Sequence, residues 1–237
     1  MQHITAIGFD LFDTLITVAQ PSRQEAPVRL LRSLQTQGFD LEEATFRPVY
    51  REVVQQFLDQ ARQEGKETYN RFWISTTLQR LGYDVEPEDG RIAQAVEGYF
   101  SAFIEYARLV PDTLDTLAIL KSRYRLGLLS NLTHGPAARQ ILDCLGLTPF
   151  FDTILISSEL GYRKPHARVF DALTEQLAVP KEQLAFIGDD LEADVRGAQQ
   201  AGLQPIWSLH GRSQLPADPA VPTIGSWREL LTLLKTS

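Results

Sequence analysis

The sequence of 237 residues contains a single cysteine, Cys144, and therefore cannot form a disulfide bond within the chain. This excludes the small disulfide-stabilised folds and predicts a reducing compartment. Cys144 lies in the apolar stretch QILDCLGL, and we expect it to pack in the interior. The sequence also lacks an apolar run of the roughly 20 residues that a transmembrane helix needs, and MQHITAIGFD lacks the segments of a signal peptide. We expect a cytoplasmic protein with no membrane partner.

Positive charge is scarcer than negative charge. There are 23 Lys and Arg residues against 30 Asp and Glu residues, which gives a formal net charge of -7. Nucleic acids and anionic membranes bind proteins that cluster Lys and Arg, so we expect neither as a partner. With 43% hydrophobic and 22% charged residues, the composition is ordinary for a globular protein and predicts no oligomeric state. The expected partner is a small-molecule substrate, and an anionic one would require local positive charge.

Five short apolar runs have the length of buried strands: ITAIGFD, RLGLLSN, TILIS, LAFIGDD and LQPIWSL. Helix-like segments alternate with the later runs or follow the last of them, at 112–123, 136–145, 167–178, 192–201 and 226–235. This alternation predicts an α/β fold with a doubly wound parallel sheet. Such sheets place their chemistry at the carboxyl ends of the strands.

The stretch between the first two predicted strands is much longer than an ordinary crossover connection. In EEATFRPVYREVVQQFLDQA, apolar residues recur at helical spacing, at Phe46, Tyr50, Val53, Val54, Phe57 and Ala61. Glycines lie where such helices would end, at Gly38, Gly65 and Gly82, which predicts a bundle of about four helices. We therefore predict a helical domain at residues 16–90, inserted into an α/β domain formed by residues 1–15 and 91–237.

Polar side chains cluster where the predicted strands end. Asp10 follows the first strand, with the hydroxyl of Thr14 four residues later, and Ser130 and Asn131 follow the second strand. FIGDDLEAD places three carboxylates within six positions, at Asp189, Asp190 and Asp194. A hard divalent cation would stabilise such close like charges, although a solvated acidic turn at a helix N-terminus would give the same pattern. Taken singly, these segments are more often turns, helix caps or surface loops, as is the lysine of GYRKPHARVF, Lys164.

The segments GFDLFDTL, GLLSN, RKP and GDDLEAD occur together, in this order, at the same predicted edge of the sheet. In this respect the chain resembles the haloacid dehalogenase superfamily, whose four signature segments they match. The resemblance covers nearly the whole chain and includes the helical insertion after the first segment, which this superfamily calls its cap. It implies a hydrolase with a Rossmann-like α/β core and a helical cap.

By this resemblance, Asp10 is the nucleophile of a covalent mechanism, Ser130 hydrogen-bonds the transferred group, and Lys164 holds the nucleophile and the developing negative charge. The resemblance also implies Mg²⁺ as the cofactor. Its expected ligands, with the last two as alternatives, are Asp10, the backbone carbonyl of Phe12, Asp189, Asp190 and Asp194. The expected contacts to the substrate from the core are Thr14 and Asn131.

Phe12 departs from the pattern of the family's phosphatases. These enzymes normally have an aspartate two residues after the nucleophile, which acts as the general acid. Here the aspartate comes one position later, at Asp13, where the family usually has glycine. An aromatic residue in place of the acid is typical of the family's dehalogenases, whose halide leaving group needs no proton. Dehalogenases, however, tend to lack acids at the positions of Asp189 and Asp190, because their substrates need no metal.

We favour a magnesium-dependent phosphatase that acts on a small phosphorylated metabolite through an aspartyl-phosphate intermediate. A metal site needs several placed carboxylates, whereas one missing acid slows the reaction by roughly 10²–10⁴-fold without removing the nucleophile. Two alternatives stay open: a 2-haloacid dehalogenase-like hydrolase, and a weakly active or non-catalytic relative that binds a ligand. The sequence does not predict which substrate is bound.

Substrate specificity is expected to come from the cap, which would close over the site. Arg51 is the first candidate, because an arginine above the site can bind a carboxylate or a phosphate through two hydrogen bonds. For the other cap candidates, packing or solvent exposure is the alternative role; these are Lys66, Tyr69, Arg71 and Trp73. His134 follows the second segment closely and is a further candidate for the pocket wall.

Overall fold

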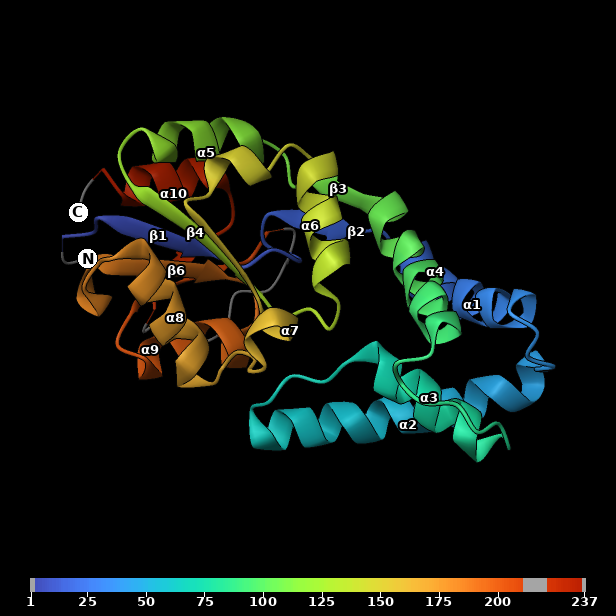
Figure 1. Cartoon of the computed structure of the whole chain (residues 1–237). Coiled ribbons are helices and arrows are strands. Elements are labelled where there is room, and N and C mark those ends of the chain that lie inside the picture. Colours follow the sequence, from blue (N-terminus) through green and yellow to red (C-terminus); the bar gives the residue numbers. More distant parts are fainter. Residues whose placement is uncertain (1–2, 211–220, 236–237) are drawn as a thin grey trace.

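The computed structural model of the chain describes residues 3–210 and 221–235. Its centre is a six-stranded parallel sheet with the strand order β5-β4-β1-β6-β7-β8 (Figure 1). The strands are Ala6–Phe9 (β1), Arg125–Ser130 (β4), Thr153–Ile156 (β5), Leu184–Gly188 (β6), Gln204–Ser208 (β7) and Thr223–Ile224 (β8). The first five confirm the strands predicted from the apolar runs. β8 was not predicted, because two residues are too few to give a hydrophobic pattern.

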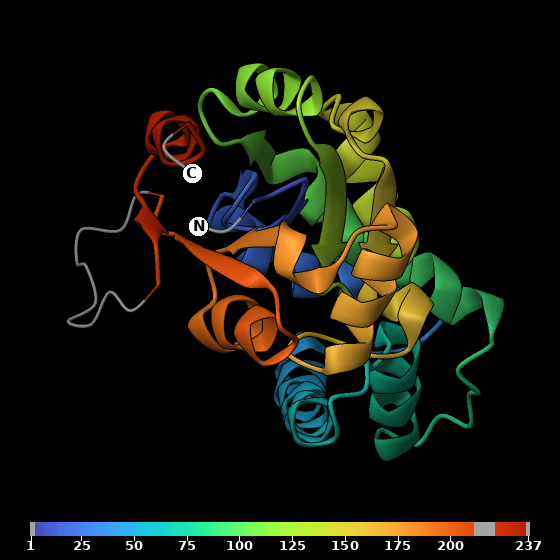
Figure 2. The same ribbon diagram turned by 90° about the vertical axis from the view of Figure 1, so that its left-hand side faces the viewer.

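Helices cover both faces of this sheet, which confirms the doubly wound α/β class. Figure 1 shows α5 and α10 on one face and α8 and α9 on the other, with a separate hydrophobic cluster beneath each group. Figure 2 shows β8 and α10 at one edge of the sheet. The helices of this domain are Thr113–Lys121 (α5), Gly135–Cys144 (α6), Ser157–Leu160 (α7), Ala167–Leu177 (α8), Gly197–Gln200 (α9) and Trp227–Leu233 (α10). The helix predicted at 192–201 begins as a π-helical turn, Leu191–Arg196, and continues as α9.

The side chains of β1 alternate between the two faces of the sheet. Ile7 and Phe9 lie in the cluster beneath α5, α6 and α10, whereas Gly8 faces α8. A Cβ atom at Gly8 or at Gly127 of β4 would lie 2.8 or 2.7 Å from a methyl group of Leu173. These two glycines therefore allow α8 to approach the middle of the sheet closely.

Residues 19–106 form four helices, in agreement with the prediction of about four: Pro21–Thr36 (α1), Glu43–Glu64 (α2), Asn70–Arg80 (α3) and Gly90–Tyr106 (α4). They enclose a hydrophobic cluster of their own. The glycines that follow α1, α2 and α3 have φ angles of 91°, 65° and 91°, which glycine adopts without strain; they are Gly38, Gly65 and Gly82. An antiparallel ribbon that was not predicted joins these helices to the sheet domain; its strands are Ile16–Val18 (β2) and Ala107–Leu109 (β3).

The contacts of α4 place it with the other inserted helices. Ile92 and Phe100 of α4 are buried in the same cluster as Phe46 of α2, and α4 runs beside α1 (Figure 1). The inserted domain was predicted to end at residue 90, where this helix begins. We propose that the inserted helical domain extends through Tyr106, because its hydrophobic cluster is incomplete without α4.

The surface of α6 corrects one expectation. Cys144 is exposed near the end of this helix, so the expectation that it packs in the interior is wrong. Ile141 and Leu142 form the buried face of α6 at this point, which leaves the next two positions on the outer face. Among the described helices, none is both long enough and apolar enough to cross a membrane.

Candidate active site

Three adjacent strands deliver the central side chains of the site. β4, β1 and β6 are neighbours in the sheet, and Ser130, Asp10 and Asp189 lie at or directly after their carboxyl ends. The backbone N–H of Asp10 donates to the carbonyl of Ile187 at 2.8 Å, so the pairing of β1 with β6 continues up to the site. Because parallel strands end at the same edge of a sheet, residues distant in sequence meet there.

Lys164 lies at the centre of this group. Its side chain is 1% exposed, and its ammonium group lies 2.6 Å from Asp10 Oδ1 and 2.7 Å from Asp194 Oδ1. The ammonium group also donates to the carbonyl of Leu129 at 2.9 Å. Of its three N–H donors, two therefore make hydrogen bonds, to Asp10 and Leu129, and the contact with Asp194 is an ion pair. Lys164 thus holds two carboxylates at a fixed separation.

The amide of Asn131 fixes the backbone of Lys164. The N–H of Lys164 donates to Asn131 Oδ1 at 2.9 Å, and Asn131 Nδ2 donates to the carbonyl of Lys164 at 3.0 Å. Both hydrogen-bonding sides of the amide are therefore engaged by one residue. Asn131 also lines the cleft described below. Its observed contacts indicate a positioning role, and the predicted contact with the substrate stays a prediction.

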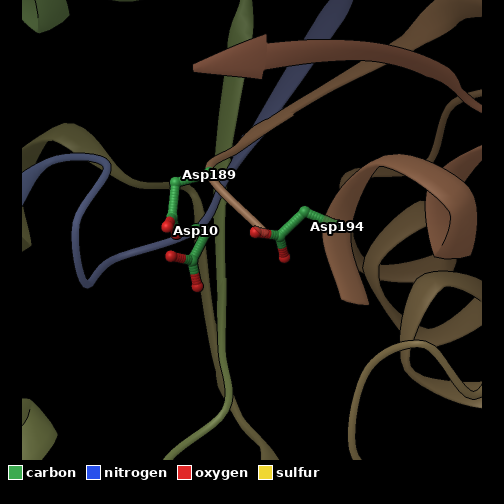
Figure 3. A group of neighbouring side chains, drawn as sticks. All are labelled: Asp10, Asp189 and Asp194. Atoms are coloured by element: carbon green, nitrogen blue, oxygen red, sulfur yellow. The ribbon is translucent and has the colours of Figure 1, made fainter. Parts of the chain in front are cut away.

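Three carboxylates come together at this point, from Asp10, Asp189 and Asp194 (Figure 3). Each contributes one oxygen to a set of atoms that all lie within 4.8 Å of one another. Oxygen atoms of carboxylates are the ligands that hard divalent cations prefer. This set of side chains therefore fits such a cation.

The electrostatics of the site also favour a cation. Burial, together with the carboxylates of Asp194 and Asp189, raises the pKa of Asp10 to about 7, against the opposing charge of Lys164. Burial alone would lower the pKa of Lys164, but the charges of Asp10 and Asp194 raise it above its ordinary value. The lysine therefore remains charged, and the site still has more negative than positive charge.

The structure distinguishes Asp190 from Asp194. The carboxylate of Asp190 is exposed and accepts hydrogen bonds from the N–H groups of Glu192 at 2.8 Å and Ala193 at 2.9 Å, so it caps the π-helical turn. Asp194 is 2% exposed, and its Oδ2 accepts from the backbone N–H of Asp190 at 3.0 Å. Of the two candidate ligands, Asp194 joins the carboxylate cluster, whereas Asp190 lies outside it and uses Oδ1 for the helix cap.

Two buried hydroxyl groups accompany the nucleophile candidate. Thr14 is fully buried, and its hydroxyl donates to Asp10 Oδ2 across 3.4 Å, which is a long contact. Thr14 is therefore buried next to Asp10. It does not lie on the exposed surface of the site, where we expected it to contact the substrate. Ser130 is also fully buried, and its Oγ has no hydrogen-bond partner in the described structure. A buried hydroxyl without a partner is unfavourable, and a ligand oxygen would satisfy it.

A cleft of about 620 Å³ lies between the two domains, above Asp10 and Lys164. Its floor includes Asp10, Lys164 and the carboxylate cluster, and α2 contributes Arg62 and the adjoining Gly65. Arg163, which precedes the central lysine, also lines it. The position of Arg163 in the segment RKP could have indicated that this residue lines the cleft. Nothing in the sequence distinguished Arg62 from the other arginines of its helix.

The comparison with known families agrees with this geometry. Residues 4–202 match the family model of the haloacid dehalogenase-like hydrolases. The chain belongs to this family. It is 31% identical over 216 residues to the glyceraldehyde 3-phosphate phosphatase of Methanopyrus kandleri, a match that covers 89% of this chain and 86% of that protein. It is also 31% identical over 245 residues to the ribulose-1,5-bisphosphate 5-phosphatase of Halopiger xanaduensis, covering 96% and 99% of the two chains.

Solved structures of haloacid dehalogenase-like hydrolases show the same fold. The 2-haloacid dehalogenase of Pseudomonas syringae superposes with a TM-score of 0.75 at 24% identity, covering 98% of this chain and 99% of that one. The hydrolase YfnB of Bacillus subtilis, in a structure bound to magnesium, superposes with a TM-score of 0.64 at 26% identity over 98% and 99% of the chains. The predicted family and fold class are confirmed.

Arg51 does not line the cleft of this hydrolase. It is exposed on α2, eleven residues before Arg62, which corresponds to about three helical turns or roughly 16 Å along the helix axis. The C-terminal end of α2 approaches the site, and Arg51 lies toward its middle. We therefore no longer expect Arg51 to bind the substrate. Arg62 and Arg163 are the arginines that line the cleft.

The other cap candidates lie outside this cleft. Trp73 is 4% exposed and donates to the hydroxyl of Thr68 at 2.8 Å, which is a packing role. Arg71 lies over the rings of Tyr69 and Phe72. His134 stacks on the ring of Phe100 and contacts Glu97, and Lys66 pairs with the carboxylate of Glu64. None of these residues therefore reaches the cleft, whereas Tyr69, Arg71 and His134 line a separate cavity of about 340 Å³.

Phe12 and Asp13 occupy the turn after Asp10. Phe12 is half-buried against the hydrophobic core and lines the cleft. Asp13 has a φ of 57°, which explains why glycine is usual there in this family. Its N–H donates to the carbonyl of Ile16 at 2.7 Å, and its carboxylate lies 3.9 Å from Arg23. The backbone of Asp13 therefore holds the turn, and Phe12 occupies the position of the usual acid.

The buried contacts of Lys164 predict a large loss of stability when this residue is replaced. Lys164→Met should lower the free energy of unfolding by about 3–5 kcal/mol in the presence of a chelator, because it leaves two carboxylates buried without their partner. Lys181→Met is the matched control. Its lysine pairs with Asp171 at the surface, where both side chains are more than 40% exposed, and the expected loss is about 0–1 kcal/mol. Urea denaturation measures both, and equal losses would contradict the structural role of Lys164.

Proposed function

We propose that the protein is a magnesium-dependent phosphatase that hydrolyses a small phosphorylated metabolite through an aspartyl-phosphate intermediate on Asp10. The observation that carries this proposal is the carboxylate of Asp10, held 2.6 Å from Lys164 beside the carboxylates of Asp189 and Asp194. A nucleophile, a cation and a set of metal ligands meet there in one cleft. The phosphatase names of relatives that match most of the chain support the same class of reaction. A phosphorylated metabolite also agrees with the expected cytoplasmic location.

The reaction has two displacements at phosphorus. In the first, an oxygen of Asp10 attacks the phosphorus, and the bond from phosphorus to the oxygen of the leaving alcohol breaks. Oδ1 is held by Lys164, whereas Oδ2 has only the long 3.4 Å contact from Thr14, so we assign the attack to Oδ2. In the second, water attacks the phosphorus of the aspartyl phosphate and releases inorganic phosphate and Asp10. The leaving alkoxide gains a proton, and the attacking water loses one.

Charge neutralisation is the main contribution of the surrounding groups. The ammonium group of Lys164 and the hydroxyl of Ser130, which has no partner among the described residues, can both donate to the transferred group. Mg²⁺ held by Asp10, Asp189 and Asp194 would offset the negative charge of the carboxylates and the phosphate. Two unit charges about 4 Å apart repel by roughly 4 kcal/mol at an effective dielectric constant of about 20. Without neutralisation, an anionic nucleophile would not approach an anionic phosphate.

Phe12 determines which substrates react fastest. A phenyl ring cannot donate a proton, and the backbone of the neighbouring Asp13 is held in the turn with its carboxylate 3.9 Å from Arg23. The leaving oxygen therefore takes its proton from water, which is a weaker acid than a positioned carboxylic acid. We expect a slow phosphatase that favours good leaving groups.

A dehalogenase is the second candidate, and Phe12 is the residue that favours it. A halide leaves without a proton, so the missing acid would not matter. The carboxylate cluster argues against this function, because a 2-haloacid carries a carboxylate that the three acids would repel without a metal. A non-catalytic relative is the third alternative, and failure to turn over any substrate of either class would identify it.

Arg62 and Arg163 are the proposed substrate-binding residues beyond the reacting phosphate. Together with Lys164, they are the Lys and Arg residues that line the cleft in the described structure. Arg62 comes from α2 of the helical domain and Arg163 from the sheet domain, where its backbone N–H donates to the carbonyl of Gly65 at 3.1 Å. Arginine binds phosphate and carboxylate groups through paired hydrogen bonds, which suits a polar, anionic metabolite.

Replacing the proposed nucleophile should abolish turnover. Asp10→Asn keeps the shape of the side chain but removes its nucleophilicity, so hydrolysis of phosphomonoesters should fall by at least about 10³-fold. Asp13→Asn is the control, because asparagine also tolerates a positive φ and the carboxylate of Asp13 takes no part in the reaction. The assay should cover a panel of phosphomonoesters and short 2-haloacids, with and without Mg²⁺. Wild-type rates in Asp10→Asn would rule out the covalent mechanism.

Binding of Mg²⁺ should depend on Asp189 but not on the adjacent Asp190. Mg²⁺ that binds the folded protein raises its melting temperature, and Asp189→Asn should greatly reduce this rise. Asp190→Asn should keep it, because Asp190 lies outside the carboxylate cluster and asparagine is an equally good helix cap. Calorimetry at increasing Mg²⁺ concentration measures both variants. The reverse order, or full activity in excess chelator, would contradict the proposed site.

Restoring the missing acid should change how the turnover of phosphomonoesters depends on the leaving group. Phe12→Asp should increase turnover of phosphomonoesters with poor leaving groups, such as sugar phosphates, by up to about 10²-fold, and of activated aryl phosphates much less. The reason is that only a poor leaving group needs the proton. Phe12→Leu is the control for loss of the packed ring, and circular dichroism checks that both variants fold. An equal gain for both classes of substrate would contradict the role assigned to this position.

A further inference from the structure

The helical domain contacts the sheet domain next to Lys164. The segment that links α2 to α3 runs antiparallel to the loop after α7, with Lys66 opposite Tyr162. The N–H of Glu67 donates to the carbonyl of Gly161 at 3.0 Å, and the N–H of Arg163 donates to the carbonyl of Gly65 at 3.1 Å. This pair of hydrogen bonds fixes the register of the two segments. The backbone of Arg163, directly before Lys164, is therefore held by the helical domain.

Glu67 inserts a buried carboxylate into this contact. Its side chain is 0% exposed, and Oε1 accepts from the N–H of Thr68 at 2.9 Å and lies 3.4 Å from Nη1 of Arg163. Oε2 accepts a hydrogen bond from the hydroxyl of Ser157, at the start of α7. A buried carboxylate is stable only when its oxygens are paired in this way. Two of its three partners belong to the sheet domain.

Ser157 connects this carboxylate to the second loop of the site. The hydroxyl of Ser157 donates to Glu67 and accepts from the backbone N–H of Leu132 at 2.9 Å. Leu132 follows Asn131, whose amide holds the backbone of Lys164 on both sides. One carboxylate of the helical domain is therefore linked to both loops that fix the position of Lys164.

We propose that Glu67 is a positioning residue, through which docking of the helical domain holds the loops that place Lys164 against Asp10. Glu67 does not line the cleft, so it acts through Arg163 and Ser157 and does not touch the substrate. When the helical domain moves away, Arg163 loses its carboxylate and its backbone partner, and Ser157 loses its acceptor. The catalytic lysine is then held less firmly. This arrangement makes the chemical step depend on closure of the cleft, and it rests on the proposed phosphatase function.

The test compares Glu67→Gln and Ser157→Ala with the control Glu64→Gln in the full chain with Mg²⁺. Glu64 ends α2, three residues before Glu67, but its carboxylate is 42% exposed and its partners in the described structure, Lys66 and Gln60, belong to its own domain. Two quantities are measured: kcat per folded molecule with p-nitrophenyl phosphate, using circular dichroism for the folded fraction, and backbone hydrogen exchange. We expect kcat to fall about 10- to 100-fold in Glu67→Gln. Exchange should accelerate at residues 131–133 and 161–164, but not in β1 and β6.

Each outcome decides the proposal. It is overturned if kcat of Glu67→Gln stays within about twofold of the wild type, or if kcat falls without faster exchange at residues 161–164, which is the pattern of a merely structural residue. If Glu67→Gln does not fold, Ser157→Ala, which removes one of the contacts, is judged by the same two criteria. A wild-type protein that hydrolyses no phosphomonoester would instead contradict the proposed function, and the exchange data would still show whether Glu67 holds these loops.

Discussion

The buried ammonium group of Lys164 is the contact on which the rest of the site depends. It joins Asp10, 154 residues earlier in the chain, and Asp194, at distances of 2.6 and 2.7 Å. Without the carboxylates, burial of the lysine would be strongly unfavourable, and without the lysine the carboxylates would repel each other. The adjacency of β1 and β6 and the amide of Asn131 both serve to bring these charges to one point.

The end of β6 shows how closely the backbone is fitted to this contact. A Cβ atom at Gly188 would lie 2.3 Å from the carboxyl group of Asp194, closer than atoms can approach, so the strand must end in glycine. Asp190 then caps a π-helical turn, which carries Asp194 back toward the strand. π-helical turns are rare in proteins, and those that occur are often found at functional sites. In this protein, the glycine, the cap and the turn together place one buried carboxylate beside Lys164.

The parts of the molecule that depend on local pattern could be predicted from the sequence. Strands buried on both faces give apolar runs, and the ends of these runs located Asp10, Ser130 and Asp189. The choice between Asp190 and Asp194 could not be made, because only the π-helical turn determines which carboxylate faces inward. The expectation for Arg51 failed because packing of distant segments decides which end of α2 approaches the cleft. Glu67 gave no signal, since a buried acid in GKETYN looks like any surface acid.

The central claim is that Asp10 is a nucleophile prepared by Lys164, Ser130 and a metal. Beryllium fluoride binds to nucleophilic aspartates as a tetrahedral mimic of an aspartyl phosphate, so a crystal structure of the protein with Mg²⁺ and beryllium fluoride tests the claim most directly. We expect an adduct on one oxygen of Asp10, with fluorine atoms contacting Lys164 and the hydroxyl of Ser130 and with Mg²⁺ on Asp189 and Asp194. A protein that binds Mg²⁺ but leaves Asp10 unmodified, or that carries the adduct on another residue, would contradict it.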